Sequence, residues 1–143
     1  MCCTKDKLDW VVIDGHNRQD AVLVTQQQHA APAGSRGEQL RWVRAEVLGI
    51  LDSHKPDSAV LRVAEPSGRS ISVGRCEVEG VVQEALASRA CPTMRASAAS
   101  LRGAYHTRTT ASYEAKLLTV PLVVSAAAAR RAPFAAGLSV FPD

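Results

Sequence analysis

The feature that most constrains the fold is a change of hydrophobic period between residues 38 and 64. Across residues 38–54, apolar side chains recur every three or four positions, as they do along one face of a helix. Lys55, Pro56 and Asp57 end this pattern. Residues 58–64 then form a nearly continuous apolar run, which is typical of a strand buried on both faces. A helix that leads into a buried strand indicates an α/β fold.

The same alternation continues toward the carboxyl terminus. Residues 76–88 predict a second helix, and residues 93–96 predict a short strand. Strands that are separated by helices are joined by right-handed crossovers and lie parallel. Residues 97–103 and 112–118 predict short helical pieces. The Ala-rich stretch 121–137 predicts a helix that Pro133 should interrupt.

Two apolar runs precede this part of the chain. Residues 10–13 and 21–25 are rich in β-branched side chains and predict strands, and the first run ends at Asp14-Gly15. The short polar link between them favours an antiparallel hairpin. Residues 29–37, rich in Ala, Pro and Gly, predict either a poor third strand or a loop. The whole pattern predicts one α/β domain over residues 1–143, with an antiparallel hairpin followed by parallel strands.

Composition and charge narrow the function only a little. The 143 residues are 46% hydrophobic and 22% charged, which is typical of a globular chain. The net charge of +3 permits a polyanionic partner, and from Arg69 onward nearly all cations are Arg, which binds phosphate better than Lys does. A GC-rich coding sequence would produce the same bias. The charged first residues and the absence of a membrane-length apolar stretch predict a cytoplasmic location without a membrane partner.

The cysteines do not indicate a metal centre. Cys2, Cys3, Cys76 and Cys91 have no zinc-ligand spacing among them, and the four histidines are scattered. In a cytoplasmic protein we expect reduced thiols. Cys76 and Cys91 have no histidine nearby in the sequence, so we interpret them as buried and unreactive.

Two carboxylates follow predicted strands and are the candidate metal ligands. Asp14 comes after residues 10–13, and Glu65 ends the run at residues 58–64. If these two strands are parallel neighbours, both side chains lie at the same edge of the sheet, where open α/β sheets bind ligands. Mg²⁺ binds carboxylates together with phosphate oxygens, and a pair of such ions can promote phosphoryl displacement. The alternative interpretation is that Asp14 caps a turn and Glu65 is a solvated loop residue.

These same residues carry a resemblance to a known family. The segment Val12-Ile13-Asp14-Gly15, followed by the run at 21–25, resembles the opening hairpin of RuvC-like Holliday junction resolvases, in which an I-D-x-G strand carries the first metal-binding Asp. Residues 56–65 resemble the fourth strand of that family, which ends in its catalytic Glu. Residues 75–87 resemble the helix that follows, with the pattern E-G-x-x-x-x-A at residues 79–85.

The resemblance implies a ribonuclease-H-like fold: a mixed five-stranded sheet with helices on both faces. It also implies that Asp14 and Glu65 are catalytic residues that bind Mg²⁺ or Mn²⁺. The chain departs from the family in its last helix, where a further carboxylate is needed and where Ala132 or Pro133 stands instead. The acids that could replace it are Glu77, Glu79, Glu84, Glu114 and Asp143, and nothing in the sequence selects one of them. We expect Glu79 and Glu84 on the solvent-facing side of a helix.

Three hypotheses about function follow. The first is a metal-dependent endonuclease, a resolvase-type hydrolase, that acts on structured or branched nucleic acid, DNA rather than RNA, with Arg75, Arg102 and Arg131 contacting phosphates. The second is a catalytically degenerate domain that binds nucleic acid or a protein partner, which the missing acid favours. The third, an actin-like phosphotransferase, needs two such halves, and the chain is too short for them. The apolar face of residues 76–88 would serve a homodimer as well as a core.

Overall fold

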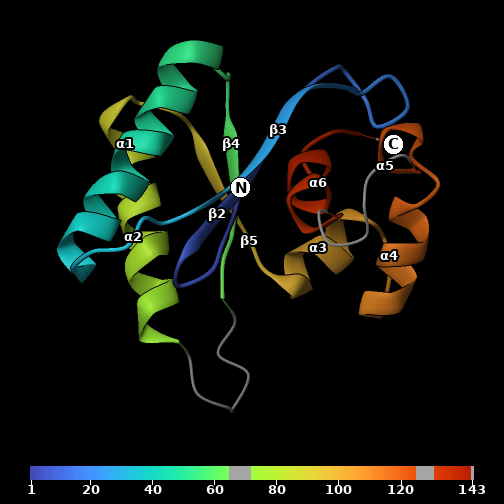
Figure 1. Cartoon of the computed structure of the whole chain (residues 1–143). Helices are drawn as coiled ribbons and strands as arrows, with labels where there is room; N and C mark the ends of the chain where they lie inside the picture. The colour runs from blue at the N-terminus through green and yellow to red at the C-terminus, as the bar shows by residue number, and fades with distance from the viewer. Residues whose placement is uncertain (65–71, 125–130, 143) are drawn as a thin grey trace.

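The computed structural model describes residues 1–64, 72–124 and 131–142. A five-stranded sheet stands between two groups of helices (Figure 1). The strands are β1 (Cys2–Cys3), β2 (Lys7–Asp14), β3 (Val22–Ala30), β4 (Ala59–Arg62) and β5 (Thr93–Ala96). The helices are α1 (Arg36–His54), α2 (Val73–Ser88), α3 (Ala98–Ala104), α4 (Thr110–Leu117), α5 (Pro121–Val124) and α6 (Arg131–Leu138).

The strand order is β3-β2-β1-β4-β5, and the sheet is mixed. The β2–β3 and β1–β2 pairs are antiparallel, whereas β1–β4 and β4–β5 are parallel. This arrangement confirms the expected mixed sheet of five strands, with an antiparallel hairpin that comes before a parallel part.

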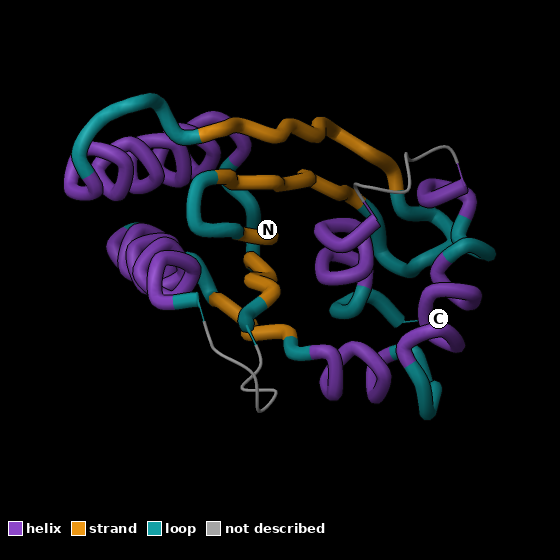
Figure 2. The backbone as a smooth tube through the Cα atoms, turned by 60° about the horizontal axis from the view of Figure 1, so that its bottom comes forward, coloured by secondary structure: helices purple, strands orange, loops and turns teal. Residues whose placement is uncertain are grey.

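The central strand, β1, is the one that the sequence patterns did not predict. It has only two residues, and Met1 extends its pairing with β4: the Met1 ammonium donates to the Val60 carbonyl at 2.7 Å, and Arg62 N donates to the Met1 carbonyl at 2.9 Å. The amino terminus therefore lies in the middle of the sheet (Figures 1 and 2). The alternative of a third strand within residues 29–37 is wrong, because β3 ends at Ala30 and a loop follows.

Helices cover both faces of the sheet, as expected (Figure 2). One core lies beneath α1 and α2, where Leu61 packs with Val47 and Val82. The other lies beneath α3 to α6, where Val60 packs with Tyr105 and Phe134. Because neighbouring strand residues point to opposite faces, a strand covered on both sides needs apolar residues at consecutive positions. The continuous apolar run of β4 has this cause.

The ends of α1 follow directly from its sequence. Ser35 caps the helix and exchanges hydrogen bonds with Glu38 in a capping box, while Lys55 adopts a left-handed conformation with φ 44° just before Pro56. Pro133, in contrast, does not interrupt α6. The helix runs through it from Arg131 to Leu138. Of the helix expected over 121–137, residues 125–130 lie outside the described part.

The last helix approaches the sheet closely because Gly137 has no side chain. A Cβ at this position would lie 2.9 Å from Cδ1 of Ile13 in β2. Without that Cβ, α6 packs closely against β2, and it also contacts β4 and β1. None of the helices in the described part of the chain combines the length and the apolarity that a membrane crossing requires.

Candidate nucleic-acid interface

Asp14 is exposed and lies at the end of β2. Its Oδ1 accepts a hydrogen bond from Gly15 N at 2.9 Å. It lines a cavity of about 600 Å³ together with residues 54–58, the segment that leads from α1 into β4. Asp14 therefore lies beside the amino end of β4.

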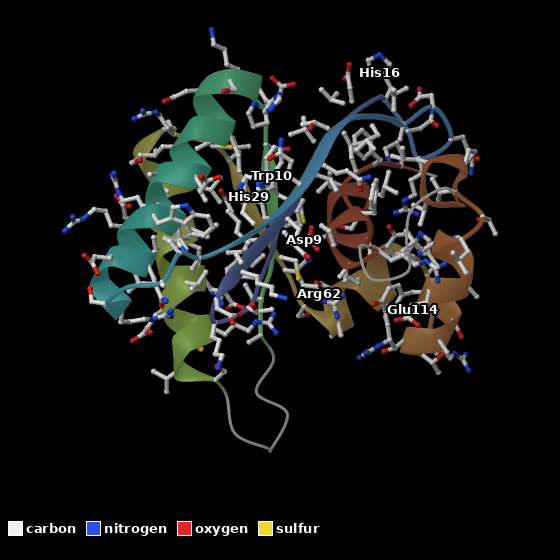
Figure 3. All side chains as sticks on the ribbon, viewed as in Figure 1. Asp9, Trp10, His16, His29, Arg62 and Glu114 are labelled. Carbon is white, nitrogen blue, oxygen red and sulfur yellow. The ribbon has the colours of Figure 1, made fainter. Side chains whose placement is uncertain are left out.

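The expectation that the strands of Asp14 and Glu65 are parallel neighbours is wrong. β1 separates β2 from β4, and β2 runs antiparallel to β1, which is parallel to β4. The carboxyl ends of β2 and β4 consequently lie at opposite ends of the strands in the sheet. In Figure 3, His16 lies at the top of the molecule, whereas Arg62, which ends β4, lies in the lower half. Glu65 itself is outside the described residues. Metal binding by Asp14 and Glu65 stays a prediction, and the strand directions do not support it.

Three of the acids that were candidates for the missing ligand, Glu77, Glu79 and Glu84, are engaged in other contacts. Glu79 is only 6% exposed, and its Oε1 accepts from Ala64 N at 2.8 Å and from Arg75 Nε at 2.7 Å. The expectation that Glu79 faces solvent is therefore wrong. Glu84 does lie on the exposed side of α2, where it pairs with Arg44 at 2.7 Å.

The remaining candidates do not complete a metal centre. Glu77 pairs with Arg36 at 2.8 Å, and Asp143 lies outside the described part. Among residues 1–64, 72–124 and 131–142, no three His, Cys, Asp or Glu side chains are grouped so as to hold a metal ion. The described residues thus do not fit the carboxylate centre that a metal-dependent nuclease of this fold implies.

The three arginines predicted to contact phosphate are not gathered in one place. Arg75 lies on α2 and forms an ion pair with the buried Glu79. Arg102 is half-buried in the last turn of α3, and Arg131 begins α6. Helices α2 and α6 pack on opposite faces of the sheet (Figure 1). Arg131 and Arg102 consequently share the α3–α6 face, and Arg75 does not.

The sequence patterns missed a fourth arginine, Arg62. It is directly opposite Cys2 in the sheet, and Cys2 is in turn opposite Asp9 of β2. Residues that are directly opposite one another in a sheet share a face, so all three side chains are on the side of α3 to α6. Two strand spacings place the Cα atoms of Asp9 and Arg62 about 10 Å apart. The sequence could have indicated Arg62, because it is the charged residue that interrupts the apolar run at 58–64.

Arg62 and Arg131 line one cavity of about 400 Å³ between β4, α4 and α6. Arg62 Nη1 donates to the Tyr113 hydroxyl at 3.2 Å. Figure 3 shows Arg62 and the exposed Glu114 on the same side of the sheet. The other lining residues are Thr110, Leu117, Ala132 and Ala135. The cavity thus combines two guanidinium groups and two hydroxyls with one carboxylate.

The Nε atom of Arg131 is buried and has no hydrogen-bond partner among the described residues. Neither Arg62 nor Arg131 lies within ion-pair distance of a described carboxylate. Buried polar atoms in proteins are nearly always paired with protein groups, water or ions. Two arginines with unused donors in one cavity favour an anion there.

The Cys3 thiol, one of the two in β1, does not supply a nucleophile. Cys3 is 1% exposed, and burial raises the pKa of its thiol to about 12. Burial also lowers the pKa of the neighbouring Met1 ammonium. A thiol with so high a pKa stays protonated at neutral pH and is a poor nucleophile. Cys3 is therefore a structural residue of the core rather than a nucleophile.

The fold is that of RuvC. The structure of Thermus thermophilus RuvC in complex with Holliday junction substrate matches with a TM-score of 0.75 at 13% identity, covering 96% of this chain and 87% of that chain. A second Thermus thermophilus RuvC structure matches with a TM-score of 0.72 at 15% identity, covering 93% of this chain and 84% of that one. The sequence matches no protein-family model and no curated protein. At these identities the likeness shows the ribonuclease-H-like fold that the sequence resemblance predicted.

Proposed function

We propose that this chain, with the ribonuclease-H-like fold of RuvC, is a nucleic-acid-binding domain that contacts phosphate through arginines and works without a carboxylate metal centre. The observation that carries the proposal is the pair Arg62 and Arg131, on β4 and α6, lining one cavity without a described carboxylate partner. A guanidinium presents a planar fork of donors that fits phosphate oxygens.

Topology and charge support this function over nuclease activity. A metal-dependent phosphoryl transfer needs several acids around the reacting phosphate. On the face covered by α3 to α6, the strand row instead reads Asp9, Cys2, Arg62 and Ala96. A single acid in that row leaves a metal ion without enough ligands, whereas the net charge of +3 favours a polyanion.

The likeness to RuvC supports nucleic acid as the partner. The matching RuvC structure is a complex with Holliday junction substrate, and that chain and this one overlap over most of their lengths. A fold does not by itself carry an activity from one protein to another. We therefore propose DNA binding, with branched DNA as the first substrate to test, and a protein partner as the competing hypothesis.

The test measures binding and cleavage separately. A fluorescently labelled four-way junction, a duplex and a single strand of the same sequence are titrated with the protein in EDTA at several salt concentrations. We expect the protein to bind, and we expect the logarithm of the association constant to fall linearly with the logarithm of the salt concentration, as phosphate contacts require. With Mg²⁺ or Mn²⁺ added, we expect the DNA to remain intact.

Two outcomes would contradict the proposal. Metal-dependent cleavage that Asp14→Asn or Glu65→Gln abolishes would establish the nuclease instead. Binding of none of the three DNAs at low salt would leave the protein partner as the better hypothesis.

A further inference from the structure

We infer that the cavity between β4, α4 and α6 is a phosphate-binding pocket, in which Arg62 and Arg131 together hold one phosphate group of the nucleic acid. This inference rests on the proposed function and adds the site and the chemical group that it recognises.

The two arginines reach the cavity from elements that the fold holds rigidly. Arg62 lies in β4, which is hydrogen-bonded to β1 on one side and to β5 on the other. The Tyr113 hydroxyl, at 3.2 Å from Nη1, fixes the direction of the Arg62 side chain, and Tyr113 is itself only 3% exposed. One of the five guanidinium donors is occupied by this bond, so the others remain for a ligand. Arg62 is thus oriented before any ligand binds.

Arg131 supplies the second cation from the start of α6. Its Nε is buried and has no acceptor among the described residues, although the rest of α6 is firmly packed. An N–H of guanidinium is a strong donor, and a phosphate oxygen is the acceptor that best satisfies it. The buried Nε therefore points to a ligand that arrives from outside the described chain.

The walls of the cavity combine hydroxyl groups, an apolar side and one carboxylate. Thr110 and Tyr113 contribute hydroxyls, which can donate to a phosphate oxygen or accept from a guanidinium. Leu117, Ala132 and Ala135 close the apolar side, and low polarity there strengthens the attraction between the ions. Glu114 is exposed, and its negative charge opposes an anion, so it weakens the binding that the arginines provide.

Because the arginines attract an anion and Glu114 repels it, their substitutions should change DNA affinity in opposite directions. Arg62→Gln and Arg131→Gln should each weaken DNA binding at least tenfold and reduce the slope of log affinity against log salt by about 1. Glu114→Gln should strengthen binding, and this variant keeps the test decisive if an arginine variant fails to fold. Arg41→Gln is the matched control, because it removes the same charge from an exposed position on α1, across the sheet.

The site itself is observed by NMR of the arginine Nε–Hε groups in the full chain. Inorganic phosphate and short strands with a 5′-phosphate or a 5′-hydroxyl are the probes. We expect saturable shifts of the Arg62 and Arg131 signals with every probe that carries phosphate. A 5′-phosphate that binds much more tightly than a 5′-hydroxyl identifies a strand end as the source, and equal binding identifies the internal phosphodiester.

The inference and the proposed function fail in different ways. DNA binding that Arg62→Gln, Arg131→Gln and Arg41→Gln weaken equally, with no shift of the two Nε–Hε signals, overturns the pocket and leaves DNA binding standing. Signals that shift with inorganic phosphate but with neither strand nor junction support an anion pocket and overturn its assignment to nucleic acid.

Discussion

The guanidinium of Arg18 lies over the ring of Tyr105, with its Cζ 4.5 Å from the ring centroid. Arg18 belongs to the loop that joins β2 to β3, whereas Tyr105 follows α3, and both side chains are buried. Arg18 Nε also donates to the Leu138 carbonyl at 3.1 Å, and its Nη2 donates to the Ala104 carbonyl at 2.8 Å. One arginine thereby joins the hairpin to the ends of α3 and α6, the helices that cover the candidate interface.

Arg18→Ala should destabilise the fold strongly. Removal of the guanidinium leaves the two carbonyls without these donors and deletes the contact with the aromatic ring, for an expected loss of about 2 to 4 kcal/mol in the free energy of unfolding. Urea denaturation measures the loss. Arg108→Ala, at an exposed position of the loop after α3, is the control and should unfold like the wild type. Equal midpoints for the two variants would show that Arg18 is not an anchor.

The turn that begins at Gly15 depends on the absence of a side chain. Its φ is +147°, and a Cβ would lie 2.9 Å from Ala21 Cα, which is backbone and cannot move aside. Gly15→Ala should therefore lower the free energy of unfolding by about 1 to 3 kcal/mol. Gly49→Ala in α1 should do the opposite and stabilise by about 0.5 to 1 kcal/mol, because nothing lies within 4 Å of the added methyl and alanine favours the helix. Thermal unfolding of both variants checks the contrast, and a neutral Gly15→Ala would refute it.

The regular elements could be predicted because their signals are local. The capping box at Ser35 and the left-handed Lys55 bound α1 within the chain itself, and the apolar run that forms β4 records burial on two faces. The strand β1 could not be predicted in this way. Its two residues carry no periodicity, and it becomes a strand because β2 and β4 supply hydrogen-bond partners on both sides.

The wrong expectation that the strands of Asp14 and Glu65 are parallel neighbours has the same origin. The apolar runs before Asp14 and Glu65 look alike in sequence. The sequence patterns did not predict β1, which lies between β2 and β4, pairs antiparallel with β2 and parallel with β4, and so sets β2 antiparallel to β4. Burial of Glu79 was missed for a related reason, because its partners, Ala64 N and Arg75 Nε, are known only from the folded arrangement. Arg62, in contrast, was visible in the sequence as a charge inside an apolar run, and a charged residue in a strand that is covered on both faces is a reason to look for a ligand.

Glu79 should prove to be a structural residue. It is 6% exposed and holds both Arg75 and the backbone just past β4, so Glu79→Ala leaves two donors without their acceptor. We expect a loss of about 2 to 4 kcal/mol in the free energy of unfolding, and a smaller one for Glu79→Gln, which keeps an acceptor oxygen. A double-mutant cycle with Arg75→Ala should give a coupling of about 1 to 3 kcal/mol. Additive losses would contradict the direct pairing.

The cysteines should differ sharply in their reactivity toward iodoacetamide. Cys76 is exposed on α2, contrary to the buried thiol that the sequence suggested, whereas Cys3 is 1% exposed. Alkylation requires thiolate and access, so Cys76 should react in the native protein and Cys3 only after unfolding. Mass spectrometry of partly labelled protein measures the order. Equal labelling of the two residues in the native state would show that β1 opens readily.

Burial of Cys3 should also make the fold sensitive to alkali. Its thiol has a pKa of about 12 in the folded chain, because burial disfavours the thiolate, and the ordinary value is 9.0. The unfolded chain therefore releases this proton first, so stability is fully present below pH 9.0 and falls as the pH rises toward 12. The slope for one proton is about 1.4 kcal/mol per pH unit. Cys3→Ala, which has no proton to release, should remove that part of the slope relative to the wild type in urea denaturation from pH 8 to 11. Parallel curves for the two proteins would mean that the Cys3 thiol titrates at the same pH in the folded and unfolded chains.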